Sequence, residues 1–425
     1  MLIKNAKIRG LEDIFSIRIE DGKFAEIEPN LIEKDNEEII DANGAMIIPP
    51  YVDSHVHLDY VCTYGEPRYN MSGTLFEGIS IWKERKKTLT KEDVKKRARH
   101  VIDWQIANGT QFIRTHVNSD EPGHVSAQAL LELREEIKDL VDLQIVAFPQ
   151  HGVYNFENGD KLLEEVVKMG VDAVGAIPHY EDTREDLVKS LHLCFDLAEK
   201  YDKLIDVHCD ETDDPHSRGI EQVANQAWKR GMFNRVTASH TTAMGSYNNA
   251  YAFKLIGLIE RSKINIISNP TINIHLQGRY DSYPKRRGIT RVDELIEHGI
   301  NVSMGTDDIM EPFYPLGTGD MLSVLNMGLH VSHLTGYNQI QNSLDFITSN
   351  GAKTLNIEDK YGIELGKPAN LLIIPAEDTY DIIRRHVKPI YSIRNGKIIM
   401  RRTPEEVKVI NNNKENYVDF KPIKK

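Results

Sequence analysis

The sequence predicts an α/β protein, a (β/α)8 TIM barrel with a small β-sandwich domain built from both chain ends. Three observations predict it. Apolar runs and amphipathic helical segments alternate through the middle of the 425-residue chain, at a spacing of roughly 30 residues. Both ends contain short alternating segments separated by tight turns. Polar residues follow the apolar runs, where the strands of a barrel would end.

The two chain ends share one pattern of short strands and turns. Asp21-Gly22 and Asn395-Gly396 are dipeptides typical of β-hairpin turns. The strands expected around these turns cover residues 2–8, 16–20, 24–28, 370–375, 391–394 and 397–400. We therefore expect residues 1–48 and 367–425 to form the β-sandwich and a C-terminal tail, and residues 49–366 to form the barrel.

The barrel strands are predicted from eight apolar runs. The first lies in the stretch from Ala45 to Val52, before two histidines. The other seven cover residues 112–117, 143–148, 173–177, 204–207, 236–239, 264–268 and 301–304. Helical segments between them include residues 91–108, 127–139, 161–169 and 186–201. An open doubly wound sheet is the alternative, but no Gly-x-Gly-x-x-Gly motif follows the early strands.

Composition excludes several classes of protein. The net charge of −12 argues against a nucleic-acid backbone as partner. No apolar run approaches the roughly 20 residues that cross a bilayer, and the N-terminus lacks a signal-peptide pattern, so we expect a cytoplasmic protein. The three cysteines (Cys62, Cys194 and Cys209) form no Cys-x-x-Cys pair, which argues against a disulfide framework and a structural zinc site.

Histidine and carboxylate residues follow several of the predicted strands. His55 and His57 are two residues apart, so in a strand they share one face. Together with His208 and Asp307 they form a set of three nitrogens and one oxygen, which suits one divalent ion, Zn²⁺ or Fe²⁺. Such an ion activates water for hydrolysis at neutral pH. Each residue alone could cap a helix or face solvent, but their gathering at several strand ends predicts a site.

Five longer stretches resemble the bacterial cytosine deaminases of the amidohydrolase superfamily. They cover residues 72–78, 146–150, 206–211, 238–244 and 283–288. The resemblance runs over nearly the whole chain. It implies a barrel with a small β-sandwich, hydrolytic removal of an amino group from a small cyclic amidine, and a homo-oligomer such as a hexamer.

The resemblance also implies metal ligands and catalytic groups. The residues that match the metal ligands are His55, His57, His208 and Asp307. Asp307 also matches the group that accepts a proton from the attacking water. Glu211 matches the acid that carries a proton to the ring nitrogen, and His240 matches the residue that orients the water. From its sequence context alone, Glu211 could equally be a solvated acid. Strand four ends without the lysine of binuclear relatives, so we expect one ion.

The expected substrate depends on the residues that match the family's substrate contacts and on the positions where this sequence differs from the family pattern. Gln150 matches the amide that pairs with the ring carbonyl and N–H edge, and Asp308 a carboxylate near the departing amine. We expect Phe313 on the wall of the substrate pocket, where close cytosine deaminases have tryptophan. Thr306 stands where they have histidine, and His151 where they have an acidic residue. We expect conversion of cytosine to uracil and ammonia. Creatinine is the leading alternative, and 5-methylcytosine and isoguanine are further ones.

Two other classes of function are open at this point. A catalytically inactive barrel would show a broken ligand set, whereas this set is complete. A ring-opening amidohydrolase would commonly use the binuclear lysine arrangement, and the pairing of Gln150 with Glu211 favours deamination instead.

Overall fold

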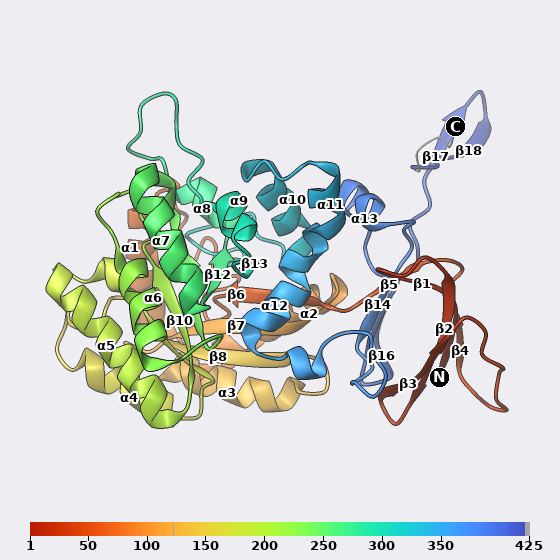
Figure 1. Cartoon of the computed structure of the whole chain (residues 1–425), viewed down its shortest axis with the longest axis horizontal. Coiled ribbons are helices and arrows are strands. Elements are labelled where there is room, and N and C mark those ends of the chain that lie inside the picture. Colours follow the sequence, from red (N-terminus) through yellow and green to blue (C-terminus); the bar gives the residue numbers. More distant parts are fainter. Residues whose placement is uncertain (122, 421–425) are drawn as a thin grey trace.

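The computed structural model describes residues 1–121 and 123–420, and it contains a parallel barrel beside a second β-sheet (Figure 1). Eight parallel strands neighbour one another in chain order, as a (β/α)8 barrel requires. They are β6 (Tyr51–Val56), β7 (Thr110–Asn118), β8 (Asp142–Phe148), β9 (Ala173–Ala176), β10 (Leu204–Cys209), β11 (Val236–His240), β12 (Asn265–Ser268) and β13 (Val302–Met304). The predicted fold class is confirmed.

The barrel closes where its last strand meets its first. Val56 and Asp307 form a parallel bridge. The Asp307 N–H donates to the carbonyl of His55 at 2.8 Å, and the His57 N–H donates to the carbonyl of Asp307 at 3.0 Å. The seam of the barrel therefore runs through the backbone of three predicted metal ligands.

Helices connect the barrel strands and cover the outside of the barrel (Figure 1). Thr90 and Thr183 cap two of them, because each hydroxyl accepts the backbone N–H of the residue three positions later. The α-helices are α1 (Leu75–Arg85), α2 (Lys91–Ala107), α3 (Val125–Ile137), α4 (Gly159–Lys168), α5 (Arg184–Tyr201), α6 (Gly219–Arg230), α7 (Asn249–Ser262), α8 (Pro270–Leu276), α9 (Val292–Glu297), α10 (Met321–Val331), α11 (Tyr337–Asn342), α12 (Ser349–Leu355) and α13 (Thr379–Arg385). The 3-10 turns are η1 (Lys86–Thr88), η2 (Pro178–Tyr180), η3 (Thr242–Ser246), η4 (Ser343–Ile347) and η5 (Glu358–Lys360).

Both chain ends contribute to the second sheet, as expected. Its eight strands form one hydrogen-bonded network in the order β16-β15-β14-β5-β1-β2-β3, with β4 pairing with β1. They are β1 (Leu2–Ile8), β2 (Ile14–Glu20), β3 (Lys23–Glu28), β4 (Ile39–Asp41), β5 (Met46–Ile48), β14 (Leu371–Ile374), β15 (Tyr391–Arg394) and β16 (Lys397–Arg401). Its core includes Ile3, Ile17, Phe24 and Ile373. The strands from the two chain ends meet where β5 pairs with β14.

The apolar stretch from Ala45 to Val52 does not form one barrel strand. Met46–Ile48 belongs to the chain-end sheet, where it pairs with β1 and β14. The barrel strand starts at Tyr51, after Pro49 and Pro50. Proline has no backbone N–H to donate, so the pair interrupts the hydrogen-bond ladder and passes the chain from one sheet to the other.

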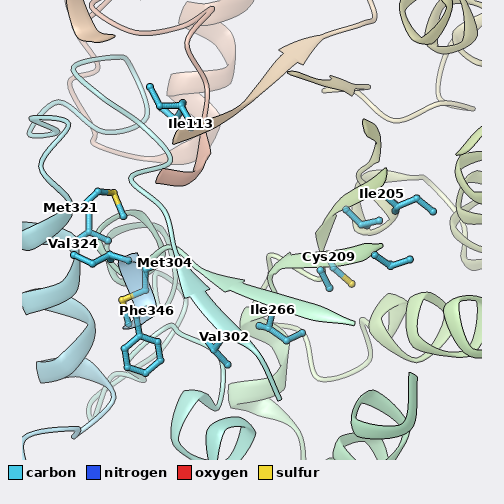
Figure 2. Packing of buried hydrophobic residues seen from close by; sticks show 14 of the residues in the cluster. Ile113, Ile205, Cys209, Ile266, Val302, Met304, Met321, Val324 and Phe346 are labelled. Carbon is cyan, nitrogen blue, oxygen red and sulfur yellow. The ribbon is translucent and has the colours of Figure 1, made fainter. Parts of the chain in front are cut away.

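Apolar side chains fill the space between the barrel strands and the helices. Val302 and Met304 of β13 lie near Met321 and Val324 of α10 and near Phe346, and all five are buried (Figure 2). Burying such side chains supplies the main favourable term of folding. Among the described residues, no helix is long and apolar enough to cross a membrane.

A small hairpin follows the chain-end sheet. The strands β17 (Lys408–Asn411) and β18 (Lys414–Tyr417) pair with each other in an exposed two-stranded sheet. Figure 1 shows this hairpin projecting from the body of the molecule. Residues 421–425 of the expected C-terminal tail lie outside the described part of the chain.

Candidate active site and metal centre

The four residues that were predicted to bind the metal converge at the carboxyl end of the barrel strands. His57 Nε2 lies 3.0 Å from His208 Nε2. Asp307 Oδ1 lies 3.4 Å from His55 Nε2 and 3.5 Å from His57 Nε2. Ligand atoms about 2.1 Å from a tetrahedral ion would be separated by about 3.4 Å. The observed separations therefore match the spacing that one small divalent ion requires.

The protonation states of these side chains also suit a cation. Burial lowers the pKa of His55, His57 and His208 well below the ordinary value, so each ring is neutral and offers a lone pair. His55 Nε2 is buried and has no hydrogen-bond partner in the described part of the chain. The pKa of Asp307 is raised, mainly by burial and secondly by the nearby charge of Glu211. A bound cation would offset both effects. The residues fit a metal ion.

A buried network orients His55. The Ser239 hydroxyl lies 3.1 Å from His55 Nδ1 and donates to Asp206 at 2.6 Å. Because that hydroxyl proton goes to Asp206, the Ser239 oxygen accepts from the Nδ1–H of His55. Arg114 binds the other oxygen of Asp206 at 3.0 Å. This arrangement fixes the tautomer that leaves His55 Nε2 free to bind an ion.

A second carboxylate behind the site holds the loop that carries Asp307. Asp53 is buried and accepts hydrogen bonds from the backbone N–H and the hydroxyl of Thr306, and from the amide of Gln105. Thr306 does not line the cavity that contains the predicted substrate residues. The departure at Thr306 therefore concerns the support of the loop and does not reshape the cavity wall.

The predicted acid and the predicted water-orienting histidine are adjacent. His240 Nδ1 lies 3.3 Å from Glu211 Oε1 and 3.7 Å from Asp307 Oδ2. The Asn273 amide lies 3.0 Å from His240 Nδ1 and donates to Glu211 Oε1 at 3.2 Å. Burial raises the pKa of Glu211 to about 8. A carboxyl group of this kind holds a proton at neutral pH and can donate it.

A small cavity opens beside the metal ligands, and all three predicted substrate residues line it: Gln150, Asp308 and Phe313. Tyr60, Leu75 and other apolar or catalytic residues complete the wall. The full set is His57, Tyr60, Leu75, Phe148, Gln150, Ile177, His208, Glu211, His240, Leu276, Asp307, Asp308 and Phe313. The lining thus combines the polar groups of the metal centre with an apolar cluster that includes Tyr60, Leu276 and Phe313.

His151 does not line this cavity, although it follows Gln150 in the sequence. Its ring nitrogen Nδ1 and its backbone N–H both contact Asp120 Oδ2. Lys86 lies 3.4 Å from the other oxygen of Asp120. The His151 side chain is therefore held by Asp120 and does not face the cavity.

Three further residues in or beside the site were not predicted from the sequence: His116, Tyr60 and Asn273. The His116 ring is buried, 4.0 Å from the ring of His55 between centroids, and its Nε2 lies 3.5 Å from Asp206 Oδ1. The alternation Arg114-x-His116-x-Asn118 within β7 was a signal, because residues two apart share one face of a strand. For Tyr60 and Asn273 the sequence offered no comparable signal.

Comparison with known proteins agrees with this geometry. The model of the amidohydrolase family matches residues 38–400. The chain belongs to the amidohydrolase family. A 5-methylcytosine deaminase from Klebsiella pneumoniae, solved with 5-fluorocytosine, is 49% identical with a TM-score of 0.93, over 96% of this chain and 99% of that one.

Two further relatives extend the comparison of this amidohydrolase. The N-isopropylammelide isopropyl amidohydrolase of Pseudomonas sp. (strain ADP) is 30% identical over 94% of this chain and 97% of that protein. A pterin deaminase of Rhizobium rhizogenes is 28% identical over 86% of this chain and 83% of that protein. This amidohydrolase is a hydrolase that acts on carbon–nitrogen bonds, and its reaction is hydrolytic deamination.

Proposed function

We propose that this amidohydrolase deaminates 5-methylcytosine to thymine with one water consumed and one ammonia released. The likeness to the Klebsiella pneumoniae 5-methylcytosine deaminase, which extends over nearly the full length of both chains, carries the proposal. That likeness favours 5-methylcytosine, an alternative of the sequence analysis, over cytosine as the first choice.

The shape of the cavity supports a substituent on the ring. Phe313 stands where close cytosine deaminases have tryptophan, and a phenyl ring leaves more room than an indole. Tyr60 and Phe313 belong to one buried apolar cluster, Leu75 packs against it, and all three line the cavity. An apolar wall of this kind suits a methyl group, because burying one removes apolar surface from water.

The polar side supplies groups for the remaining ring atoms. The Gln150 amide can pair with the C2 carbonyl and the adjacent N–H, and the Glu211 carboxyl can protonate ring nitrogen N3. His240 lies between Glu211 and Asp307, where it can orient the attacking water. Asp308 can hydrogen bond to the departing amine, and Asp307 can accept a proton from the water.

One divalent ion, zinc or iron, would be held by His55, His57, His208 and Asp307. When bound, the ion would supply activation of the water that attacks C4 of the ring. The protein's own contribution is to hold the ring so that C4 faces that water, and to deliver a proton to N3 as the C=N bond loses its double-bond character.

A panel of cyclic amidines tests the proposal. Metal-loaded protein would be assayed for ammonia release with 5-methylcytosine, cytosine, 5-fluorocytosine, isoguanine and creatinine. We expect the highest kcat/KM for 5-methylcytosine, with mass spectrometry showing thymine and an intact ring. A kcat/KM for cytosine or creatinine above that for 5-methylcytosine would contradict the proposed substrate, and a ring-opened product would contradict deamination.

A further inference from the structure

Tyr60 is a cavity residue to which neither the family pattern nor the catalytic scheme gives a role. It follows Asp59 just beyond β6 and is 2% exposed. Its hydroxyl donates a hydrogen bond to Oε1 of Gln150, the amide proposed to pair with the edge of the substrate. A buried phenol with this partner links the barrel wall directly to substrate recognition.

Packing fixes the place of the Tyr60 ring. The ring stacks on the imidazole of His57, with centroids 5.0 Å apart and planes 6° apart. Trp82 of α1 lies 4.4 Å away and Phe313 lies 6.0 Å away, both measured between ring centroids. A ring held on three sides by aromatic groups keeps its hydroxyl at one position.

In the structure that hydroxyl donates to the acceptor end of the Gln150 amide. An amide has an acceptor end and a donor end, and the two are told apart only by their hydrogen-bond partners. Because the phenol donates to Oε1, the NH₂ group of Gln150 is left to face another acceptor. Oε1 also keeps one lone pair for a second donor.

We propose that Tyr60 is a positioning residue that sets Gln150 to recognise a ring carbonyl flanked by an N–H group. This inference rests on the proposed deamination of a pyrimidine. The NH₂ group of Gln150 would donate to the C2 carbonyl, and the free lone pair of Oε1 would accept from N1–H. The ligand class is therefore a ring with adjacent amidine, carbonyl and N–H groups, as in 5-methylcytosine, cytosine and isoguanine.

The same arrangement discriminates against creatinine. Creatinine presents an exocyclic amine, a ring nitrogen and a carbonyl in the same order, but a CH₂ group follows the carbonyl where the pyrimidines have N–H. A fixed Gln150 would then keep an unused acceptor beside that CH₂, which lowers affinity. A freely turning amide would be less selective, so Tyr60 contributes to specificity through Gln150.

The test compares Tyr60→Phe with Tyr64→Phe. Tyr60→Phe keeps the stacked ring and removes the hydroxyl, whereas Tyr64 is exposed, lies outside the cavity lining and packs against Tyr69. We expect Tyr60→Phe to raise the KM for 5-methylcytosine and the Kd for thymine by about 3- to 10-fold. We expect kcat and the bound metal content to stay near wild type, and Tyr64→Phe to change none of these values.

A double-mutant comparison separates positioning from general packing. If Tyr60 acts through Gln150, then Tyr60→Phe introduced into Gln150→Ala should have little further effect on KM or on thymine binding. Equal effects in both backgrounds would overturn the inference, as would a Tyr60→Phe protein with wild-type KM and wild-type thymine affinity.

Calorimetry measures thymine binding without turnover. The test of the Tyr60 inference is therefore independent of the result of the substrate panel. If the panel favours another ring, the proposed substrate fails, and the Tyr60 inference is judged by the KM for that ring together with the Kd for thymine. A wild-type protein that does not bind thymine would overturn the inference itself.

Discussion

The two sides of the active-site cavity are built differently. On the metal side, His55 and His208 lie on barrel strands and Asp307 lies shortly after one. Behind His55, hydrogen bonds run through Ser239 and Asp206 to Arg114. On the substrate side, Leu75 begins α1 and Phe313 lies in the loop after β13, and both contribute apolar surface.

This difference separates the residues that determine the reaction from those that determine which substrate is accepted. Strands that pair with both neighbours hold their side chains in place, so the geometry for activating water is set by the barrel itself. Loops and helix ends after the strands accept substitutions at lower cost, and these segments form the wall that a substituent on the ring would touch. The predictions below test whether substitutions on the two sides affect different quantities.

The largest expected effect is that of Glu211→Gln. The amide keeps the shape of the carboxyl group but carries no acidic proton for the ring nitrogen, so kcat should fall by about 10²- to 10⁴-fold. Metal content, measured by plasma emission, should stay at the wild-type level. Asp214→Asn, in the same acidic run but outside the cavity lining, is the matched control. Substantial turnover by Glu211→Gln would disprove the assigned role.

A smaller effect should follow from Ser239→Ala on the metal side. The change removes the hydrogen bond to His55 Nδ1 and frees the imidazole to change tautomer, so metal affinity should fall by about 10- to 100-fold. Competition with a chelator measures it. Ser262→Ala removes a buried hydroxyl far from the site and should leave affinity unchanged. An unaltered affinity in Ser239→Ala would mean that the network does not orient His55.

On the substrate side, Phe313→Trp should change specificity. A Cβ placed on Gly78 would lie 2.8 Å from Phe313 Cδ1, so α1 leaves no room behind the ring. The larger indole must therefore extend toward the cavity, and the ratio of kcat/KM for 5-methylcytosine to that for cytosine should fall by about 10-fold. Phe76→Trp, at an exposed position on α1, is the control. A ratio that stays constant would remove Phe313 from the methyl-binding wall.

The smallest expected effect near neutral pH is a loss of activity that begins as the pH approaches 8. Burial raises the pKa of Glu211 to about 8, so its carboxyl group is protonated below that pH and loses its proton above it. Because the protonated form is the donor, kcat/KM should be about half its plateau near pH 8 and fall about 10-fold per further pH unit. Rates measured from pH 6 to 10 check this, and a flat profile would contradict it.

The metal side could be predicted from the sequence more fully than its surroundings. The spacing of His55 and His57 and the polar residues after apolar runs are local patterns, so His208 and Asp307 could be assigned before the structure.

The supporting residues could not be predicted in the same way. Asp206, Ser239 and Arg114 come together from separate strands, and their contacts depend on how the barrel closes. The role of Tyr60 depends on one hydrogen bond to Gln150, a residue 90 positions away. Although the domain boundary was expected after residue 48, the apolar stretch from Ala45 to Val52 was predicted to form one barrel strand, because the residues before and after Pro49 and Pro50 look alike.

The place where the barrel closes affects how a bound metal ion would stabilise the barrel. The first and last barrel strands meet at the backbone of His55, His57 and Asp307, whose side chains face one another at the same place. An ion held there would join the first and last strands of the barrel through residues about 250 positions apart in the chain. Loading the ion should therefore act like a clasp, slowing hydrogen exchange at the amides of His57 and Asp307 relative to those on the opposite strands.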